Sequence, residues 1–374
     1  MYTVKTPEYE LLLQSCYNAK QPLFVQGGPG IGKSAIPRQL FKKTAEKEGR
    51  LFVEWSDLTL EDRKTCIEKP SEYFVFMDAR TSQMDTTSLV GIPNMTKTDL
   101  LENIPYSWVV YFTNAAAAGV LFFDELNLAP SIVQSITYSA IHDRVISDRR
   151  ISDKVYIFAA GNRSQDKAHT FDMPLPLRDR FAECEVEIDV DAWINWAARS
   201  NINSHLISFI NWKPANLYNA DKVKAEKPST PRGVARASNL LGDMDIGSNH
   251  AHMMASISCG ESFATEFQAY CKVYKQLDWP AIFANPASVN SMILDKQYAI
   301  SAGLADQFKR HPDDVKLHDK IFTVADNLRE DFAVFSYRMI SNANRSVWKK
   351  SLTALNRQKA FAGKYAKYLL DNLT

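Results

Sequence analysis

The stretch that decides the fold is GGPGIGKS, residues 27–34, which matches the pattern G-x-x-x-x-G-K-[ST] at every defined position. The short apolar run 22–25 before it predicts a buried strand, and residues 35–47 after it predict a helix. A strand, a glycine-rich loop and a helix in this order are the context in which the pattern binds phosphate. Glycines let main-chain amides turn toward phosphate oxygens, and the helix N-terminus adds the positive end of its dipole.

The loop predicts a site for a nucleotide and a magnesium ion. We expect Lys33 to contact the phosphate oxygens and the Ser34 hydroxyl to ligate Mg²⁺. The residues expected to bind ATP here share their place in the loop or directly after it, and they are Gly28, Pro29, Gly30, Ile31, Gly32, Lys33, Ser34 and Ala35. The alternative is a chance glycine turn, and the second motif below argues against it.

That second motif is an apolar run, 120–125, which ends in two adjacent carboxylates, Asp124 and Glu125. Charged residues at the C-terminal end of a buried parallel strand lie where α/β sheets bind ligands. We therefore expect Asp124 to hold Mg²⁺, directly or through water, and Glu125 to polarise a water against the γ-phosphate. A solvated strand end is the alternative interpretation.

Asn162 and two arginines extend the candidate site. Asn162 ends the strand predicted at 154–161, where its amide could bind both the attacking water and the γ-phosphate, although an asparagine turn cap is the alternative. Arg178 and Arg180 precede the last predicted strand, and a guanidinium suits developing phosphoryl charge. We favour Arg180 over Arg178 as a catalytic group, and a surface ion pair with Asp179 is the alternative.

Arg232 begins a predicted helix at 231–241, beyond the strand-rich part of the chain. From there it could bind the γ-phosphate and couple the state of the nucleotide to the angle between domains. A solvated arginine in the first helical turn is the alternative.

The order of the predicted elements indicates an α/β fold followed by helices. Strands expected at 73–78, 154–161 and 183–190 alternate with helices such as 130–141, which predicts a doubly wound parallel sheet over 1–190. Helical patterns then predict an all-α lid at 191–280 and a helical C-terminal extension at 281–374. Two further segments lie between these elements. Residues 50–71 suggest an insertion between the first helix and the next core strand, and the polar stretch 216–227 suggests a linker or a loop.

Charge and cysteine usage narrow the class of protein. The chain has 374 residues with 44 basic and 43 acidic side chains, so it offers no general basic field for nucleic acid. Five scattered cysteines indicate free thiols in a reducing compartment, and the N-terminus predicts no secretory signal, which together favour the cytoplasm. The apolar stretch 108–123 is too short for a membrane span and predicts a buried strand after an alanine-rich segment.

Together these motifs resemble the AAA+ ATPases, in particular the MoxR-like branch that includes dynein- and midasin-type modules. The resemblance covers about residues 20–245. Residues 27–34 resemble the Walker A motif of this family, and residues 120–125 resemble its Walker B motif. Asn162 resembles sensor 1, Arg178 and Arg180 the arginine-finger box, and Arg232 sensor 2. TSQMDTTSLVGIP and AAAAGVLFFDELNLAP are similar to segments of the MoxR-like branch. The loosely matched regions suggest a divergent member, for which a phage origin is one explanation.

This resemblance implies an ATP- and Mg²⁺-dependent ring, commonly a hexamer, that remodels a protein partner. Arg180 would then act on the nucleotide of a neighbouring subunit, and Arg232 in cis or in trans. A helix-2-type insert at about 92–112 would face a pore or a partner, and a von Willebrand factor A-type protein is a common partner in the family. Two alternatives stay open, a nucleic-acid-handling loader or motor and a nucleotide switch that does not hydrolyse ATP.

Overall fold

The computed structural model describes residues 1–96, 102–163, 171, 173–221, 227–242, 244–361 and 363–365. The chain divides into two compact units, 1–188 and 189–374. The insert predicted at 92–112, the linker predicted at 216–227 and the extension predicted at 281–374 each lie partly outside the described residues.

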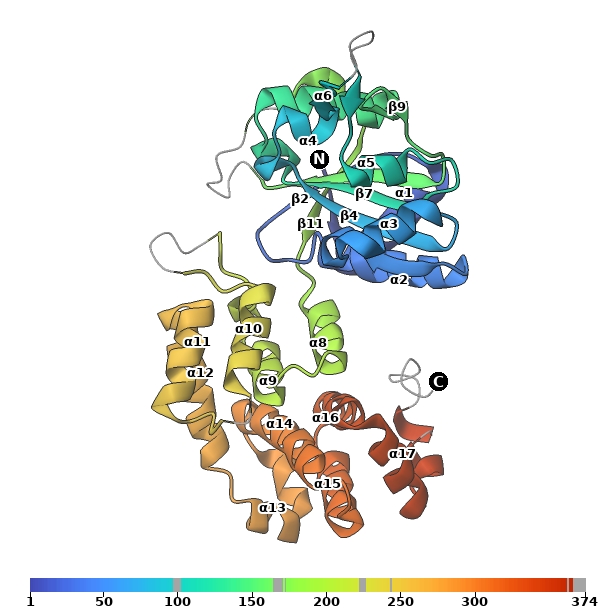
Figure 1. Cartoon of the computed structure of the whole chain (residues 1–374). Coiled ribbons are helices and arrows are strands. Elements are labelled where there is room, and N and C mark those ends of the chain that lie inside the picture. The colour runs from blue at the N-terminus through green and yellow to red at the C-terminus, as the bar shows by residue number, and fades with distance from the viewer. Residues whose placement is uncertain are drawn as a thin grey trace. The chain divides into compact units, whose positions relative to one another are not determined.

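The first unit is built on a seven-stranded sheet in the order β1-β11-β2-β10-β7-β4-β3, and every neighbouring pair in it is parallel (Figure 1). Its strands are β1 (Tyr2–Lys5), β2 (Leu23–Gly27), β3 (Leu51–Glu54), β4 (Tyr73–Arg80), β7 (Ala118–Asp124), β10 (Val155–Gly161) and β11 (Ala182–Glu187). The central strands β7 and β10 are almost wholly buried, as near-continuous apolar runs predict for a parallel sheet covered on both faces.

Helices cover both faces of this sheet. The helices of the first unit are α1 (Thr6–Ala19), α2 (Ala35–Lys47), α3 (Leu60–Glu68), α4 (Thr86–Val90), α5 (Ser107–Phe112), α6 (Ser131–His142) and the short α7 (Leu175–Arg178). On one face Phe41 of α2 packs against Phe74, Phe76 and Phe158. The other face forms a separate core with α5 and α6, in which Leu121 and neighbouring strand residues are fully buried.

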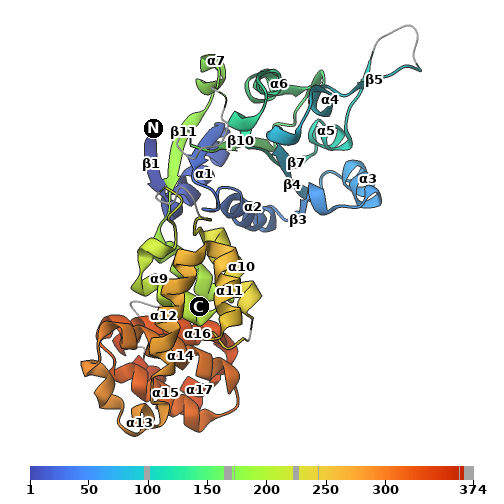
Figure 2. The same ribbon diagram turned by 90° about the vertical axis from the view of Figure 1, so that its left-hand side faces the viewer.

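Two short hairpins complete the first unit, β5 (Ile92–Pro93) with β6 (Asn103–Ile104), and β8 (Val145–Ile146) with β9 (Arg149–Arg150). Figure 2 shows β5 beside α4 and α5, on the side of the unit away from β1. The described part of the first hairpin carries exposed apolar side chains, since Ile92 and Ile104 are both more than half exposed.

Three sequence expectations need correction. Residues 50–71 are not an insertion, because β3 pairs with β4 at the edge of the sheet and α3 follows it. The exposure of Leu51 explains the error, since an edge strand lacks the continuous apolar run of a central one. The stretch 108–123 does contain the predicted buried strand, which is β7 up to Phe123, but most of helix α5 precedes it, and that helix was not predicted. The strand predicted at 183–190 ends at Glu187, because the Asp189 side chain accepts from the Ala192 amide and caps the next helix.

The second unit is helical. Its helices are α8 (Val190–Arg199), α9 (Ser204–Trp212), α10 (Pro231–Leu241), α11 (Asn249–Cys259), α12 (Glu261–Lys275), α13 (Trp279–Ala284), α14 (Leu294–Arg310), α15 (Val315–Asn327), α16 (Glu330–Ala343) and α17 (Arg345–Ala354). The predicted fold class is therefore confirmed, an α/β core with a glycine-rich phosphate-loop motif followed by a helical region. Within the described ranges, none of the helices is long and apolar enough to cross a membrane.

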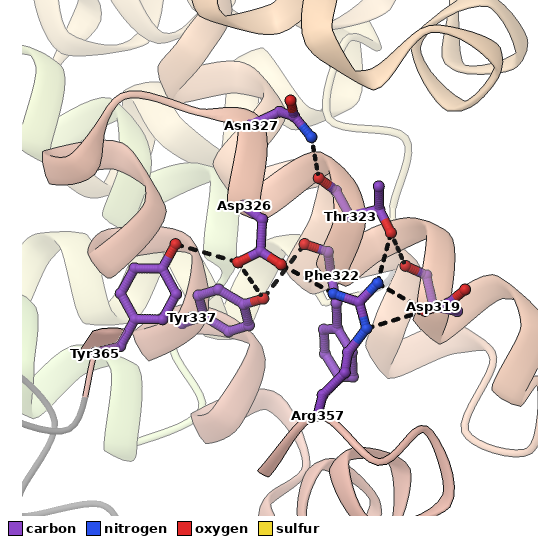
Figure 3. A network of polar contacts seen from close by, with 8 residues as sticks. All are labelled: Asp319, Phe322, Thr323, Asp326, Asn327, Tyr337, Arg357 and Tyr365. Carbon is purple, nitrogen blue, oxygen red and sulfur yellow. Dashed lines mark hydrogen bonds and ion pairs between the residues drawn. The ribbon is translucent and has the colours of Figure 1, made fainter. Parts of the chain in front are cut away.

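A polar network ties the C-terminal residues of the second unit to α15 and α16 (Figure 3). Arg357 forms ion pairs with Asp319 at 2.8 Å and with Asp326 at 2.9 Å. The hydroxyls of Tyr337 and Tyr365 donate to the same Asp326 oxygen at 3.0 and 3.1 Å. Because Asp326 joins three donors from separate segments, this network holds Arg357 and Tyr365 against α15 and α16.

Candidate active site

The glycine-rich loop runs from the end of β2 to the start of α2. Gly30 and Gly32 have φ angles of 72° and 105°, a region that side chains rarely adopt. A Cβ atom on Gly32 would also lie 3.1 Å from the Cδ1 atom of Ile36. The path of the loop therefore requires glycine at both positions, and it brings Lys33 and Ser34 to the N-terminus of α2.

Lys33 is held over this loop by hydrogen bonds from its ammonium group. Nζ donates to the carbonyl oxygens of Gly27 at 2.6 Å and Gly28 at 3.0 Å, and to Oδ1 of Asn162 at 3.2 Å. Below it, the hydroxyl of the fully buried Tyr9 donates to the Lys33 carbonyl at 3.1 Å. The lysine thus joins the loop to the end of β10, the strand next to β2.

Ser34 and Asp124 form the candidate metal-binding pair. The Ser34 hydroxyl donates to Oδ2 of Asp124 at 3.0 Å, and the Glu125 amide donates to Oδ1 at 2.9 Å. Burial raises the pKa of Asp124, and the negative charge of Asp78 raises it further. A cation at this position would relieve both effects, because it stabilises the ionised carboxylate.

Glu125 follows Asp124 in a left-handed conformation, with φ at 58°. Its carboxylate accepts a short hydrogen bond from the Ser82 hydroxyl, and the fully buried Thr81 donates to the Asp124 carbonyl at 2.8 Å. Thr81 and Ser82 directly follow β4, the strand beside β7. The residues that follow β4 therefore hold both the main chain at Asp124 and the side chain of Glu125, at the end of β7.

Asn162 lies at the end of β10 and is positioned by Asn127. The Asn127 side chain accepts from the Asn162 amide at 3.1 Å and donates to the Asn162 carbonyl at 2.7 Å. Gly161 makes this possible, since a Cβ atom there would lie 2.4 Å from Oδ1 of Asn127. The buried Asn127 thus orients the main chain that carries the Asn162 side chain toward Lys33.

The two candidate arginines lie in different surroundings. Arg178 makes a bidentate ion pair with Glu183, at 2.7 Å from Nε and 2.9 Å from Nη2. Arg180 reaches Asp179 only at 3.8 Å, and both of these side chains are exposed. An open hollow of about 710 Å³ next to them is lined by Leu175, Pro176, Arg178, Asp179, Phe181 and Glu183.

Arg232 belongs to the second unit, at the second residue of α10. The helix begins with Pro231, and the Thr230 hydroxyl caps it by accepting from the Gly233 amide at 3.1 Å. The Arg232 side chain is exposed. Its predicted contact with the γ-phosphate joins two units and stays a prediction.

The strands explain why the first-unit residues meet. β2, β10, β7 and β4 are neighbours in a parallel sheet, so their C-terminal ends lie along one edge. That edge carries the loop with Lys33 and Ser34, then Asn162, then Asp124 with Glu125. Hydroxyl and carboxylate oxygens suit Mg²⁺, which proteins usually hold through one or two carboxylates together with substrate phosphates. The described residues contain no group of three His, Cys, Asp or Glu side chains that could hold a metal ion.

The sequence predicted no positioning role for Tyr9, Thr81, Ser82 or Asn127. Thr81, Ser82 and Asn127 enter the sequence analysis only within the two segments that resemble the MoxR-like branch. The TS pair at the end of the YFVFMDAR strand was the available signal, because polar residues at adjacent parallel strand ends meet. No pattern in the sequence distinguishes Tyr9 in this way, since a single aromatic residue on an amphipathic helix is expected to pack in the hydrophobic core.

Comparisons with known proteins find solved structures that are only weakly similar to this chain. No protein-family model and no curated protein matches this chain. Among solved structures, a RuvB mutant from Thermotoga maritima is 15% identical and covers 75% of this chain and 73% of its own, with a TM-score of 0.30. NtrX from Brucella abortus in complex with ADP is 12% identical, and the match covers 92% of this chain and 68% of the NtrX chain, with a TM-score of 0.29. These scores are too low to establish a function, which is inferred below from the site itself.

Proposed function

We propose that this chain is an AAA+ ATPase that binds and hydrolyses Mg²⁺-ATP. One observation carries the proposal, the meeting of Lys33, Ser34, Asp124, Glu125 and Asn162 at the C-terminal edge of four adjacent parallel strands. A lysine, a metal-binding hydroxyl and carboxylate, a second carboxylate and an amide are the groups that phosphoryl transfer to water requires. When bound, Mg²⁺ neutralises charge on the phosphates as the terminal group leaves.

Each residue then has a distinct task. The loop from Gly28 to Gly32 and the α2 N-terminus bind the phosphates, with Ala35 at the first helical position, and Lys33 places positive charge against them. Ser34 and Asp124 hold the ion. Glu125, which Ser82 holds in position, orients and polarises the attacking water. Asn162 donates a hydrogen bond to the terminal phosphate or to the water.

The test compares Glu125→Gln with Glu61→Gln, an exposed glutamate on α3 in the same unit. Glu125→Gln should lower ATP turnover by about 10²- to 10⁴-fold, the range for a lost general base, and should leave ATP affinity close to that of the wild type. Glu61→Gln should change neither quantity. Turnover near the wild-type rate in Glu125→Gln would contradict the role of this residue, and absence of ATP binding by the wild type would contradict the proposal as a whole.

The proposal includes assembly, with Arg180 serving the site of a neighbouring subunit. Among the described residues, the exposed Arg180 guanidinium makes a long contact to Asp179 alone, whereas the Arg178 guanidinium is engaged by Glu183, and this difference favours Arg180. Mixing provides the test. Lys33→Ala subunits cannot bind ATP and Arg180→Ala subunits cannot supply the arginine, so each is inactive alone. Mixed assemblies should recover part of the activity, and no recovery in assemblies shown to be mixed would contradict action in trans.

We further propose that the work done is the remodelling of a protein partner, as in the MoxR-like branch. The exposed apolar side chains of the β5–β6 hairpin, Ile92, Met95 and Ile104, support a protein contact there. A von Willebrand factor A-type protein is the partner that the family resemblance suggests. Polar replacement of Met95, which is 85% exposed, should leave basal turnover unchanged and reduce its stimulation by the partner.

A further inference from the structure

A second aspartate lies beside the candidate metal pair. Asp78 of β4 is the register partner of Phe122 in β7, two residues before Asp124. Side chains two residues apart on a strand point to the same face of a sheet, so Asp78 and Asp124 are diagonal neighbours on one face. This is the face of α2, because Arg38 of that helix lies over the ring of Phe76, two residues before Asp78.

Arg38 fixes the position of Asp78 relative to the phosphate loop. Its guanidinium makes a short ion pair with Oδ2 of Asp78, donates to Oε2 of Glu54 at 2.9 Å and donates to the Ser34 carbonyl at 3.1 Å. One rigid planar group therefore connects Asp78 to the residue expected to ligate the ion. Because Oδ2 is occupied in this way, the orientation of Oδ1 is also set.

The Oδ1 atom of Asp78 is buried and has no hydrogen-bond partner among the residues that the structure describes, and the side chain as a whole is only 10% exposed. A buried carboxylate oxygen without a donor is costly, and native proteins normally satisfy it. Glu54 shares the guanidinium of Arg38, so Asp78 receives only part of one positive charge. The Oδ1 atom of Asp78 would therefore be stabilised by a hydrogen-bond donor that carries positive charge or is polarised by a nearby positive charge.

We propose that Asp78 is an additional residue of the metal site, whose Oδ1 accepts a hydrogen bond from a water molecule in the hydration shell of the Mg²⁺ held by Ser34 and Asp124. This inference rests on the proposed function of the same site. Mg²⁺ dehydrates reluctantly and keeps several waters when proteins bind it with nucleotide, so it brings such a donor with it. Groups that orient the ligands of a metal typically change its affinity by about 10- to 100-fold when removed.

The experiment titrates Mg²⁺ into the full-length protein saturated with ADP, and measures ADP affinity with and without Mg²⁺. Asp78→Asn keeps the shape of the side chain and removes its charge. We expect it to weaken Mg²⁺ affinity by about 10-fold or more, while ADP affinity without Mg²⁺ stays within about twofold of the wild type. Glu54→Gln is the matched control, because it removes the other carboxylate bound to Arg38 and should leave Mg²⁺ affinity unchanged.

Two results would overturn the inference. Asp78→Asn with wild-type Mg²⁺ affinity would show that the carboxylate does not reach the ion, and equal losses of ADP affinity with and without Mg²⁺ would show a role in loop packing alone. If Asp78→Asn does not fold, Asp78→Ser removes the same charge and leaves Arg38 paired with Glu54. A wild-type protein that binds ADP without any effect of Mg²⁺ would instead count against the proposed function.

Discussion

Replacing Ser82 with alanine tests whether the end of β4 positions the carboxylate proposed to activate water. Glu125 has a left-handed main chain and accepts a hydrogen bond from the Ser82 hydroxyl. A hydrogen bond to a charged group contributes about 1.5–3 kcal/mol, and both side chains are only partly buried, so we use the lower end. At 1.36 kcal/mol for each factor of ten, turnover should fall by about 10-fold, with the KM for ATP unchanged.

The assay is steady-state ATP turnover at several ATP concentrations, on protein whose unfolding transition matches that of the wild type. Ser82→Thr keeps the hydroxyl and should restore most of the activity. Ser135→Ala is a matched control, because it removes an exposed hydroxyl that donates to the Ser131 carbonyl within helix α6. A positioning role also predicts that Ser82→Ala adds nothing in a Glu125→Gln background.

ATP hydrolysis by Ser82→Ala at the wild-type rate would contradict this positioning role. A second contrary result would be that Ser82→Ala lowers the residual turnover of Glu125→Gln by the same factor as in the wild type. In that case the two residues would act independently, and the hydrogen bond between them would have no part in catalysis.

Two predictions concern the stability of the second unit. Burial lowers the pKa of His205 to about 4, below its unfolded value of about 6.5, so the free energy of unfolding should fall by up to about 3 kcal/mol as the pH drops through this window. In urea titrations, the free energy of unfolding should fall less steeply with decreasing pH for His205→Phe than for His250→Gln, an exposed control. Equal slopes for the two variants would contradict this. Arg357→Met should lower the free energy of unfolding by about 1–3 kcal/mol, because it breaks the ion pairs with Asp319 and Asp326, and an unchanged melting temperature would show that these pairs add nothing.

The sequence alone predicted the residues that meet at the sheet edge, for a physical reason. Lys33 and Ser34 are positioned by a local pattern of strand, loop and helix. Asp124 and Asn162 each end an apolar strand, and parallel strands bring their C-terminal ends to one edge whatever their order. The structure places these residues within hydrogen-bonding distance of one another, as Lys33 to Asn162 and Ser34 to Asp124.

Features that depend on strand order and register could not be predicted in this way. The edge strand β3 was missed because its residues are half-exposed and resemble a loop segment. The pairing of Ser82 with Glu125 requires β4 to lie beside β7 in one particular register, which places Arg80 opposite Asp124. Asp78 depends on the same register, because a shift of one residue would turn its side chain to the other face of the sheet.

The left-handed conformation of Glu125 shows why the site needs support beyond the motif residues. A non-glycine residue at a φ of 58° costs of order 1 kcal/mol and persists only where its surroundings hold it. Thr81 supplies that support by donating to the Asp124 carbonyl, and Ser82 does so by donating to the Glu125 carboxylate. Main chain held in this way cannot relax into a regular helical turn, so the Glu125 carboxylate stays hydrogen-bonded to Ser82 at the C-terminal end of β4. The chemistry of the site is therefore encoded locally, whereas its orientation is encoded by which strands are neighbours.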